Sequence, residues 1–227
     1  MFFDPLYLIM MAPVLLFAML ASLTFKLWSN QYIKTPNSRN ITGLDTVQIL
    51  TDRYQNPITI GQTPNDFGDN FDPRNDELTL SRIVANRPSI ASVAITAHEY
   101  GHVRQKFEKN PLMVFRRLLV PAVNIGTNVG YILIIIGILL TATNLAWLGL
   151  ILFSLSTVFA FLTLPIEIDA SSKALSMIRE LNLLSENEIP AAKKVLFGAS
   201  LTYFAALFSS LANLLYFAIR IQGSSRD

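Results

Sequence analysis

Two histidines four residues apart are the most chemically informative feature of this sequence. They are the two that the chain contains, and both lie in the segment His98-Glu99-Tyr100-Gly101-His102. Residues four apart on a helix lie on one face, one turn apart, so both imidazoles can reach a single zinc ion. Glu99 could then take a proton from the attacking water and later pass it to the leaving amine. The segment predicts a catalytic zinc centre; the alternative is two surface histidines with a chance glutamate between them.

A catalytic zinc usually has three protein ligands and one open position. The chain has no cysteine and no third histidine, so the third ligand must be a carboxylate. Glu167 is the candidate, because it is the first charged residue after an uncharged stretch and a carboxylate at a membrane boundary is costly without a partner. Asp169 is too close to share its helix face, and we expect it to hold a ligand histidine by the other ring N–H. The alternative is that both acids merely end a membrane helix in water.

Other polar residues are weaker candidates for the site. Tyr203, near the end of the last apolar run, could polarise a substrate carbonyl, although an aromatic interface anchor is the simpler reading. Asp66, Asp69 and Asp72 resemble part of a calcium loop but lack the closing glutamate of an EF-hand. We expect them to be solvated loop acids. Gly101 has no side chain, which leaves room for another element to approach the metal.

The elements that must position these residues are mostly apolar. Hydrophobic residues make up 52% of the 227-residue chain and charged ones 15%. Three runs lack Asp, Glu, Lys and Arg: Leu6–Phe25, Leu118–Ile166 and Val195–Ile219. A bilayer requires about 20 apolar helical residues per crossing. The runs therefore predict four transmembrane helices near 6–27, 118–140, 145–166 and 195–219, with a polar turn at Thr141–Asn144; the alternative is a soluble protein with an apolar helical core.

Charge placement predicts the orientation of the chain. Of 18 Lys and Arg residues, only Arg220 and Arg226 lie outside the two hydrophilic regions, which follow the first and third spans. Cations gather on the cytoplasmic side of membrane proteins. We therefore expect a multi-pass protein of the inner or plasma membrane whose site faces the cytoplasm. The net charge of +2 reflects this bias and requires no nucleic-acid partner.

The hydrophilic region near 29–117 predicts mixed secondary structure. Apolar spacing favours helices over 44–54 and from Pro88-Ser89 to Phe107, while residues 57–60 and 77–80 have strand patterns. A loop rich in Gly, Pro, Asn and Asp separates the strands at 61–74. The predicted fold is thus mainly α and membrane-embedded, a single domain over 1–227 with a small cytoplasmic α+β zincin-like insertion that contains a short β-hairpin. The strand at 77–80 could bind substrate as an added strand.

Several segments together resemble the neutral zinc metallopeptidases of the YugP type, four-pass bacterial membrane proteins. The matching segments, which span nearly the whole chain, are Phe2-Phe3-Asp4-Pro5-Leu6-Tyr7, Phe71-Asp72-Pro73-Arg74, Leu78-Thr79-Leu80-Ser81, Ala97-His98-Glu99-Tyr100-Gly101-His102, Val120-Pro121-Ala122-Val123-Asn124, Leu164-Pro165-Ile166-Glu167-Ile168-Asp169-Ala170-Ser171 and Leu201-Thr202-Tyr203. The resemblance implies zinc, peptide-bond hydrolysis and Glu167 as third ligand. The arrangement also looks like the HtpX-type membrane proteases, whose glutamate motif is spaced differently. Tyr100 departs from the small or aliphatic residue usual in such families, at a position that faces away from the metal.

The sequence therefore predicts a membrane-bound, zinc-dependent endopeptidase that hydrolyses polypeptides, membrane proteins included. Its oligomeric state is not predicted. One rival is a non-catalytic zinc-binding scaffold, or pseudoprotease, which would have no use for Glu99. A second rival is a transporter, which usually carries ionisable residues in mid-membrane, whereas these spans have none.

Overall fold

The computed structural model describes residues 4–66 and 68–224, and their contacts divide the chain into two compact units. The bundle unit comprises the described parts of Met1–Ala21, Val114–Pro165 and Thr202–Asp227. The mixed unit comprises Ser22–Met113 and Ile166–Leu201. The prediction of one domain over the whole chain remains a prediction, and each unit is described by itself.

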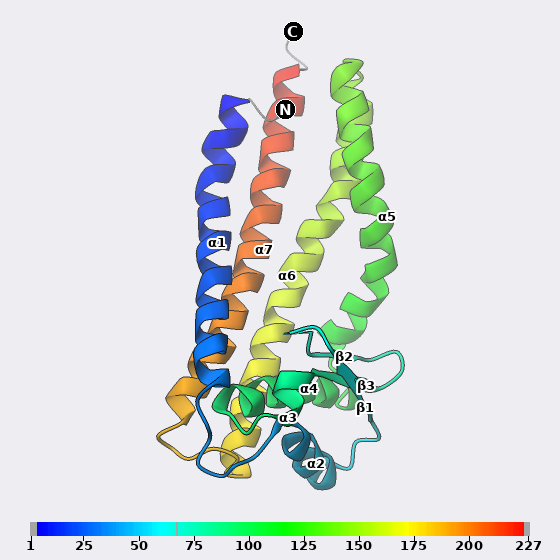
Figure 1. The fold of residues 1–227 in the computed structure, drawn as a ribbon. Helices are drawn as coiled ribbons and strands as arrows, with labels where there is room; N and C mark the ends of the chain where they lie inside the picture. The colour runs from blue at the N-terminus through cyan, green and yellow to red at the C-terminus, as the bar shows by residue number, and fades with distance from the viewer. Residues whose placement is uncertain (1–3, 67, 225–227) are drawn as a thin grey trace. The chain divides into compact units, whose positions relative to one another are not determined.

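Four long helices supply the bundle unit and continue into segments of the mixed unit. They are α1 (Pro5–Ile33), α5 (Pro111–Leu139), α6 (Thr143–Glu180) and α7 (Ile189–Ser224) (Figure 1). All four are long and apolar enough to cross a membrane. The four predicted spans are thereby confirmed as apolar helices, although the helices extend past them, most of all α6 beyond residue 166.

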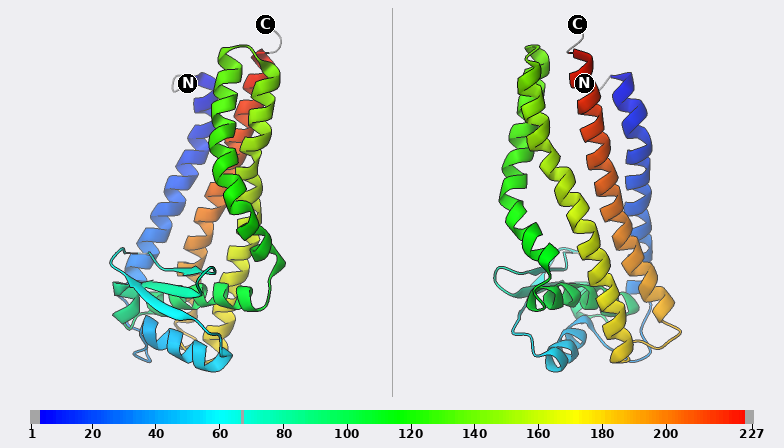
Figure 2. Two further views of the ribbon diagram at one scale, coloured as in Figure 1. Left: turned by 90° about the vertical axis from the view of Figure 1, so that its right-hand side faces the viewer. Right: turned by 180° about the vertical axis from the view of Figure 1, so that it is seen from behind.

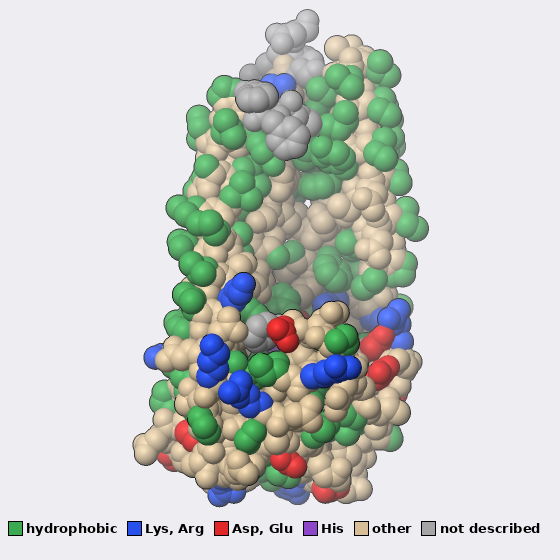
Figure 3. Space-filling model, viewed as in Figure 1, with side chains coloured by type: hydrophobic (Ala, Val, Ile, Leu, Met, Phe, Trp, Pro, Cys, Tyr) green, Lys and Arg blue, Asp and Glu red, His purple; other side chains and the backbone are tan. Residues whose placement is uncertain are grey.

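Within the bundle unit, small residues and aromatic rings pack the helices together. The segments of α5 and α6 lie side by side in both views of Figure 2, and Gly130 and Gly149 face each other there so closely that a Cβ on Gly130 would come within 2.6 Å of the Gly149 carbonyl oxygen. Phe153 of α6 meets Phe217 of α7 edge-on, with ring centroids 5.6 Å apart. Large hydrophobic side chains are exposed on these helices, such as Leu139 and Phe161. Figure 3 shows hydrophobic side chains, in green, along the length of the long helices. Such a surface suits a lipid environment.

The mixed unit contains the remaining helices. Helix α2 (Gly43–Tyr54) begins with a capping box between Thr42 and Asp45, α3 (Arg82–Asn86) is short, and α4 (Ile90–Phe107) is capped by the Ser89 side chain. Helices α2 and α4 match the two predicted from spacing, whereas α3 was not predicted. Helix α4 is buried on almost every face up to Val103, so it forms the centre of this unit's core.

The sheet of the mixed unit differs from the predicted hairpin. Its strands are β1 (Thr59–Thr63), β2 (Asn70–Asp72) and β3 (Glu77–Ser81), in the order β1-β3-β2. The two predicted strands pair in parallel, and β2, which lies within the predicted loop, pairs antiparallel with β3. The pairing of 57–60 with 77–80 as a hairpin was therefore wrong, whereas the short hairpin that the insertion contains is formed by β2 and β3. Substrate addition at 77–80 was also wrong, because β3 is central and its main-chain groups are already paired on both sides.

Candidate metal centre

Helix α4 places both imidazoles on one buried face. From Ile90 to Val103 all its residues except the half-buried Glu99 are buried, and His98 and His102 are 9% and 8% exposed. Their ring centroids lie 4.9 Å apart, edge to face. This is the one-turn spacing that the segment predicts.

Glu167 of α6 meets the two histidines in the core of the mixed unit. Its Oε2 lies 3.2 Å from Nε2 of His98 and 3.4 Å from Nε2 of His102. The ligand atoms of these three residues all lie within 4.8 Å of one another, and Glu167 is 2% exposed. The alternative in which Glu167 merely ends a membrane helix in water is wrong, since α6 continues to Glu180 and the carboxylate is buried.

A close backbone approach between α4 and α6 makes this convergence possible. A Cβ on Gly101 would lie 2.6 Å from the carbonyl oxygen of Ala170, so no side chain fits there. The same α6 turn carries Glu167, three residues earlier. As predicted, the missing side chain of Gly101 leaves room beside the histidines, and the α6 backbone at Ala170 occupies it.

The second nitrogen of each imidazole has its own hydrogen-bond partner. His98 Nδ1 lies 3.1 Å from the Ser171 hydroxyl, and His102 Nδ1 lies 2.9 Å from Gln105 Oε1. Such partners orient a metal-binding histidine and set its tautomer. Sequence reasoning missed both, although Gln105 follows His102 by three residues and Ser171 follows Glu167 by four, spacings that place each pair on one helix face.

Asp169 contacts the site differently from the expectation. Its Oδ2 accepts a hydrogen bond from Gln105 Nε2 at 2.8 Å, and Gln105 in turn contacts His102. The acid therefore acts on the histidine through the glutamine rather than directly. Two residues beyond Glu167 on a helix, it points to a different side of α6.

Charged groups at the centre perturb one another. Burial raises the pKa of Glu99 above its usual value; the charges of His98 and His102 oppose this rise, and those of Glu167 and Asp69 add to it. For His102, burial by itself would lower the pKa, but the hydrogen bond and charge attraction of Glu167 outweigh it and raise the pKa to about 9. The centre thus favours a cation next to Glu167, whether a proton or a metal ion.

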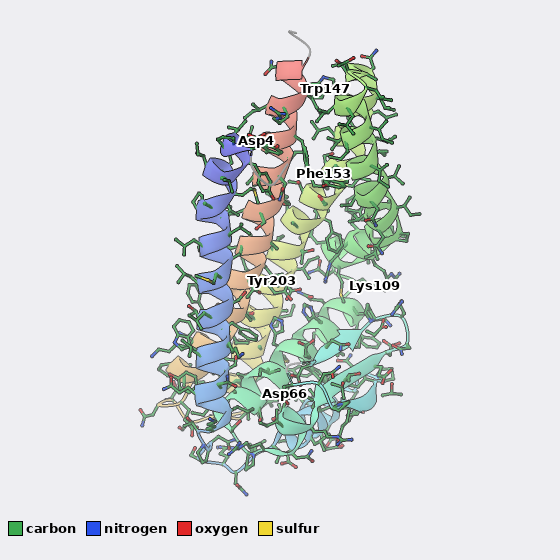
Figure 4. All side chains as sticks on the ribbon, turned by 45° about the horizontal axis from the view of Figure 1, so that its top comes forward. Asp4, Asp66, Lys109, Trp147, Phe153 and Tyr203 are labelled. Atoms are coloured by element: carbon green, nitrogen blue, oxygen red, sulfur yellow. The ribbon has the colours of Figure 1, made fainter. Side chains whose placement is uncertain are left out.

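Asp69 is not the solvated loop acid that its sequence context predicts. Its carboxylate accepts hydrogen bonds from the backbone N–H and the hydroxyl of Ser81, and burial raises its pKa. Asp66 is exposed, and Asp72 pairs with Arg74. Tyr203 lies on α7 in the bundle unit, where Figure 4 labels it, and the three converging residues belong to the mixed unit.

The donor set fits a catalytic zinc. Two imidazole nitrogens and one carboxylate oxygen match a His₂Glu arrangement with a fourth position open, and the far nitrogens are held in place. Tyr100 is fully buried and turns to other residues, its hydroxyl donating to Asn56 and its ring lying 6.1 Å from that of Tyr54. It leaves the donor set undisturbed.

Comparison with known proteins gives two matches over most of the chain. A family described as "Putative neutral zinc metallopeptidase" matches residues 7–222. A curated protein of Bacillus subtilis (strain 168), "Putative membrane protease YugP", is 36% identical over 200 residues, which cover 86% of this chain and 88% of that protein. No solved structure matches the chain.

Proposed function

The chain belongs to the family of putative neutral zinc metallopeptidases, and from that membership we propose that it is a zinc-dependent endopeptidase of the cell membrane. The observation that carries the proposal is the buried convergence of His98, His102 and Glu167. The membrane part of the proposal is supported by four helices long and apolar enough to span a bilayer, and by a membrane protease relative.

In this proposal His98, His102 and Glu167 would hold the metal, with the converging atoms Nε2, Nε2 and Oε2 as its ligands. Zinc bound there would polarise the scissile carbonyl and make water a stronger nucleophile at neutral pH. Ser171 and Gln105 keep the two imidazole rings turned toward Glu167 by contacting their far nitrogens. The buried setting limits competing water around these donors.

Glu99 is the proposed general base and then acid. It follows the first ligand in the chain and, unlike both histidines, retains partial solvent exposure. Its raised pKa brings its carboxylate closer to the operating pH, which favours both taking a proton from water and returning it to the leaving amine. Asp169 is proposed to support His102 through Gln105, and a role of Tyr203 in polarising the substrate carbonyl stays a prediction from the sequence.

The rival scaffold function is less well supported. A site that held zinc only for structure would gain nothing from the Glu99 carboxylate beside the first ligand, and burial, which raises the pKa of Glu99, makes its charge costly to keep there. A transporter would place ionisable side chains within the apolar runs, which have none between Leu118 and Ile166.

The decisive test compares wild type with Glu99→Gln, both purified in detergent. We expect equal zinc content and a loss of cleavage of a denatured membrane protein by about 10²–10⁴-fold, because the proton carrier is removed while the ligands remain. Asp66→Asn, which changes an exposed loop acid, serves as the matched control and should cleave normally. Equal cleavage by wild type and Glu99→Gln would reject the mechanism.

The proposed cytoplasmic orientation has its own test. Because the chain has no cysteine, single cysteines at the exposed positions Asp66 and Thr141 can be labelled separately. A membrane-impermeant maleimide should label Thr141→Cys in intact cells and Asp66→Cys only in inside-out vesicles. The opposite pattern would place the site on the other side of the membrane.

A further inference from the structure

We propose that Gln105 is a positioning residue of the metal centre, which sets the tautomer of His102 and ties α4 to the α6 turn that carries Glu167. The proposal rests on the function proposed above. Gln105 is fully buried, and both ends of its amide are engaged at 2.7–2.9 Å.

The direction of the Gln105 amide follows from its partners. Its Nε2 lies 2.7 Å from the backbone carbonyl oxygen of Ile166 and 2.8 Å from Oδ2 of Asp169. A backbone carbonyl can only accept a hydrogen bond, so the NH₂ group of Gln105 must face α6. Its two hydrogens are donated there, one to each of these oxygens. The amide oxygen is thereby left facing His102, and flipping the amide would set an oxygen against two acceptors.

This direction decides which proton His102 keeps. The Gln105 oxygen can only accept, so Nδ1 of His102 must carry the hydrogen at 2.9 Å. A neutral imidazole has one N–H and one bare nitrogen, and the bare one is then Nε2, the atom 3.4 Å from Glu167. In its neutral form His102 is thus oriented to bind a metal ion through Nε2.

His98 offers an internal contrast. Its Nδ1 faces the Ser171 hydroxyl at 3.1 Å, and a hydroxyl can donate or accept. Ser171 therefore orients the His98 ring without choosing its tautomer. Of the two ligands, only His102 has its protonation pattern imposed by a neighbour.

The same glutamine joins the two helices that supply the ligands. It projects from α4, and the carbonyl that it contacts belongs to Ile166, the residue immediately before Glu167. Together with the close approach of Gly101 to Ala170, this bond fixes the position of the Glu167 backbone relative to the histidines. Loss of the glutamine should make both the orientation of the His102 ring and the spacing between α4 and α6 less well defined.

The test uses zinc affinity and histidine spectra, with the full-length protein in detergent and a purification tag that contains no histidine. Gln105→Met keeps a long unbranched side chain without the amide. We expect its zinc affinity, measured by chelator competition, to fall about 10–100-fold. Thr96→Val, an isosteric change on the same helix at a buried hydroxyl with no hydrogen-bond partner among the described residues, is the matched control and should bind zinc within twofold of wild type.

The spectra separate positioning from general stabilisation. The chain contains two histidines, so ¹⁵N-histidine labelling of the zinc-loaded protein reports on the site alone. Wild type should show a slowly exchanging Nδ1–H on His102, and Gln105→Met should lose it. Gln105→Leu, a second variant that lacks the amide, should lose this signal as well.

Two outcomes would overturn the proposal. One is wild-type zinc affinity and an unchanged Nδ1–H signal in Gln105→Met. The other, which decides the matter if Gln105→Met does not fold, is a zinc-loaded wild type that lacks the slowly exchanging Nδ1–H signal of His102. A wild-type protein that binds no zinc would instead reject the proposed function itself, so the two failures are distinguishable.

Discussion

The interiors of the two units are held together by different means. In the mixed unit, buried polar side chains make specific polar contacts. Glu167 contacts two imidazole nitrogens, and Gln105 hydrogen-bonds to three partners. In the bundle unit, glycine-backbone approaches and ring packing join the helices along most of their length, as at Gly130 and at Phe153 with Phe217. Polar contacts join α1 and α7 near Asp4, which accepts a hydrogen bond from Tyr216. One interior depends on the direction of hydrogen bonds and charges, and the other on shape.

Helix α6 contributes to both interiors, and its sequence changes from uncharged to acidic where it passes from one unit to the other. Its segment Thr143–Pro165 has no charged residue, whereas Ile166–Glu180 carries the acids Glu167 and Asp169. The same backbone geometry thus serves a lipid-facing segment and a ligand-bearing one. The two segments should differ in which substitutions they tolerate, and the zinc affinity and stability of variants in each unit measure this difference.

The largest effect is expected at the carboxylate of the centre. Glu167→Gln keeps the side-chain shape but removes a charge that faces two imidazoles at 3.2 and 3.4 Å. Zinc affinity should fall by more than about 100-fold, beyond the range typical for residues that only support ligands. Glu186→Gln, at an exposed acid, is the matched control; similar zinc affinity in the two variants would remove Glu167 from the centre.

A smaller effect, in both stability and zinc affinity, is expected from Gly101→Ala. The added methyl group would lie 2.6 Å from the Ala170 carbonyl oxygen and push α4 from α6. Overpacking of this kind costs about 1–3 kcal/mol of unfolding free energy, and zinc affinity should fall with it because the ligands come from these two helices. Chemical denaturation and chelator competition measure the two quantities; a stability loss with unchanged zinc affinity would contradict the link between helix spacing and the centre.

Gly130→Ala sharpens the comparison, because it creates an equally close contact in the bundle unit, 2.6 Å from the Gly149 carbonyl oxygen. We expect a similar loss of about 1–3 kcal/mol, but zinc affinity and cleavage per folded molecule within twofold of wild type. If Gly130→Ala lost zinc as Gly101→Ala does, the two interiors would not be separable in this way.

The smallest effect is expected from Gly223→Ala, near the end of α7. A Cβ there would have no neighbour within 4 Å, so only helix propensity changes. Alanine is favoured over glycine by up to about 1 kcal/mol in a helix interior, and by less near an end. Thermal unfolding in detergent should show an unchanged or slightly raised midpoint, and a clear destabilisation would point to a contact of Gly223 in the folded protein.

The sequence predicted the elements better than their pairing. Run lengths without charge located the four long helices, and the spacing from His98 to His102 located the face of α4, because both signals are local. The order of the sheet was not predictable in the same way: β2 is three residues long within a stretch rich in turn formers, and its pairing with β3 depends on contacts far along the chain.

The sequence predicted the candidate metal-binding residues of the site but not the buried polar residues around them. Glu167 followed from the absence of other donor types, and its convergence with the histidines agrees with that reasoning. Gln105 and Asp69 were missed, since a buried amide or acid differs from a solvated one only through neighbours that the tertiary fold supplies. Helical spacing from His102 would have been enough to suggest Gln105 as a partner.

The division of the donor atoms between α4 and α6 has a consequence for any attempt to shorten this chain. A water-soluble fragment cut from residues 22–113 would contain both imidazoles but lack the acid, which sits on a helix that also crosses the apolar region. A continuous stretch of chain that holds all three donors must therefore include the apolar segment that ends at Pro165. A shortened protein without that segment would have to join residues 22–113 to residues 166–201 directly.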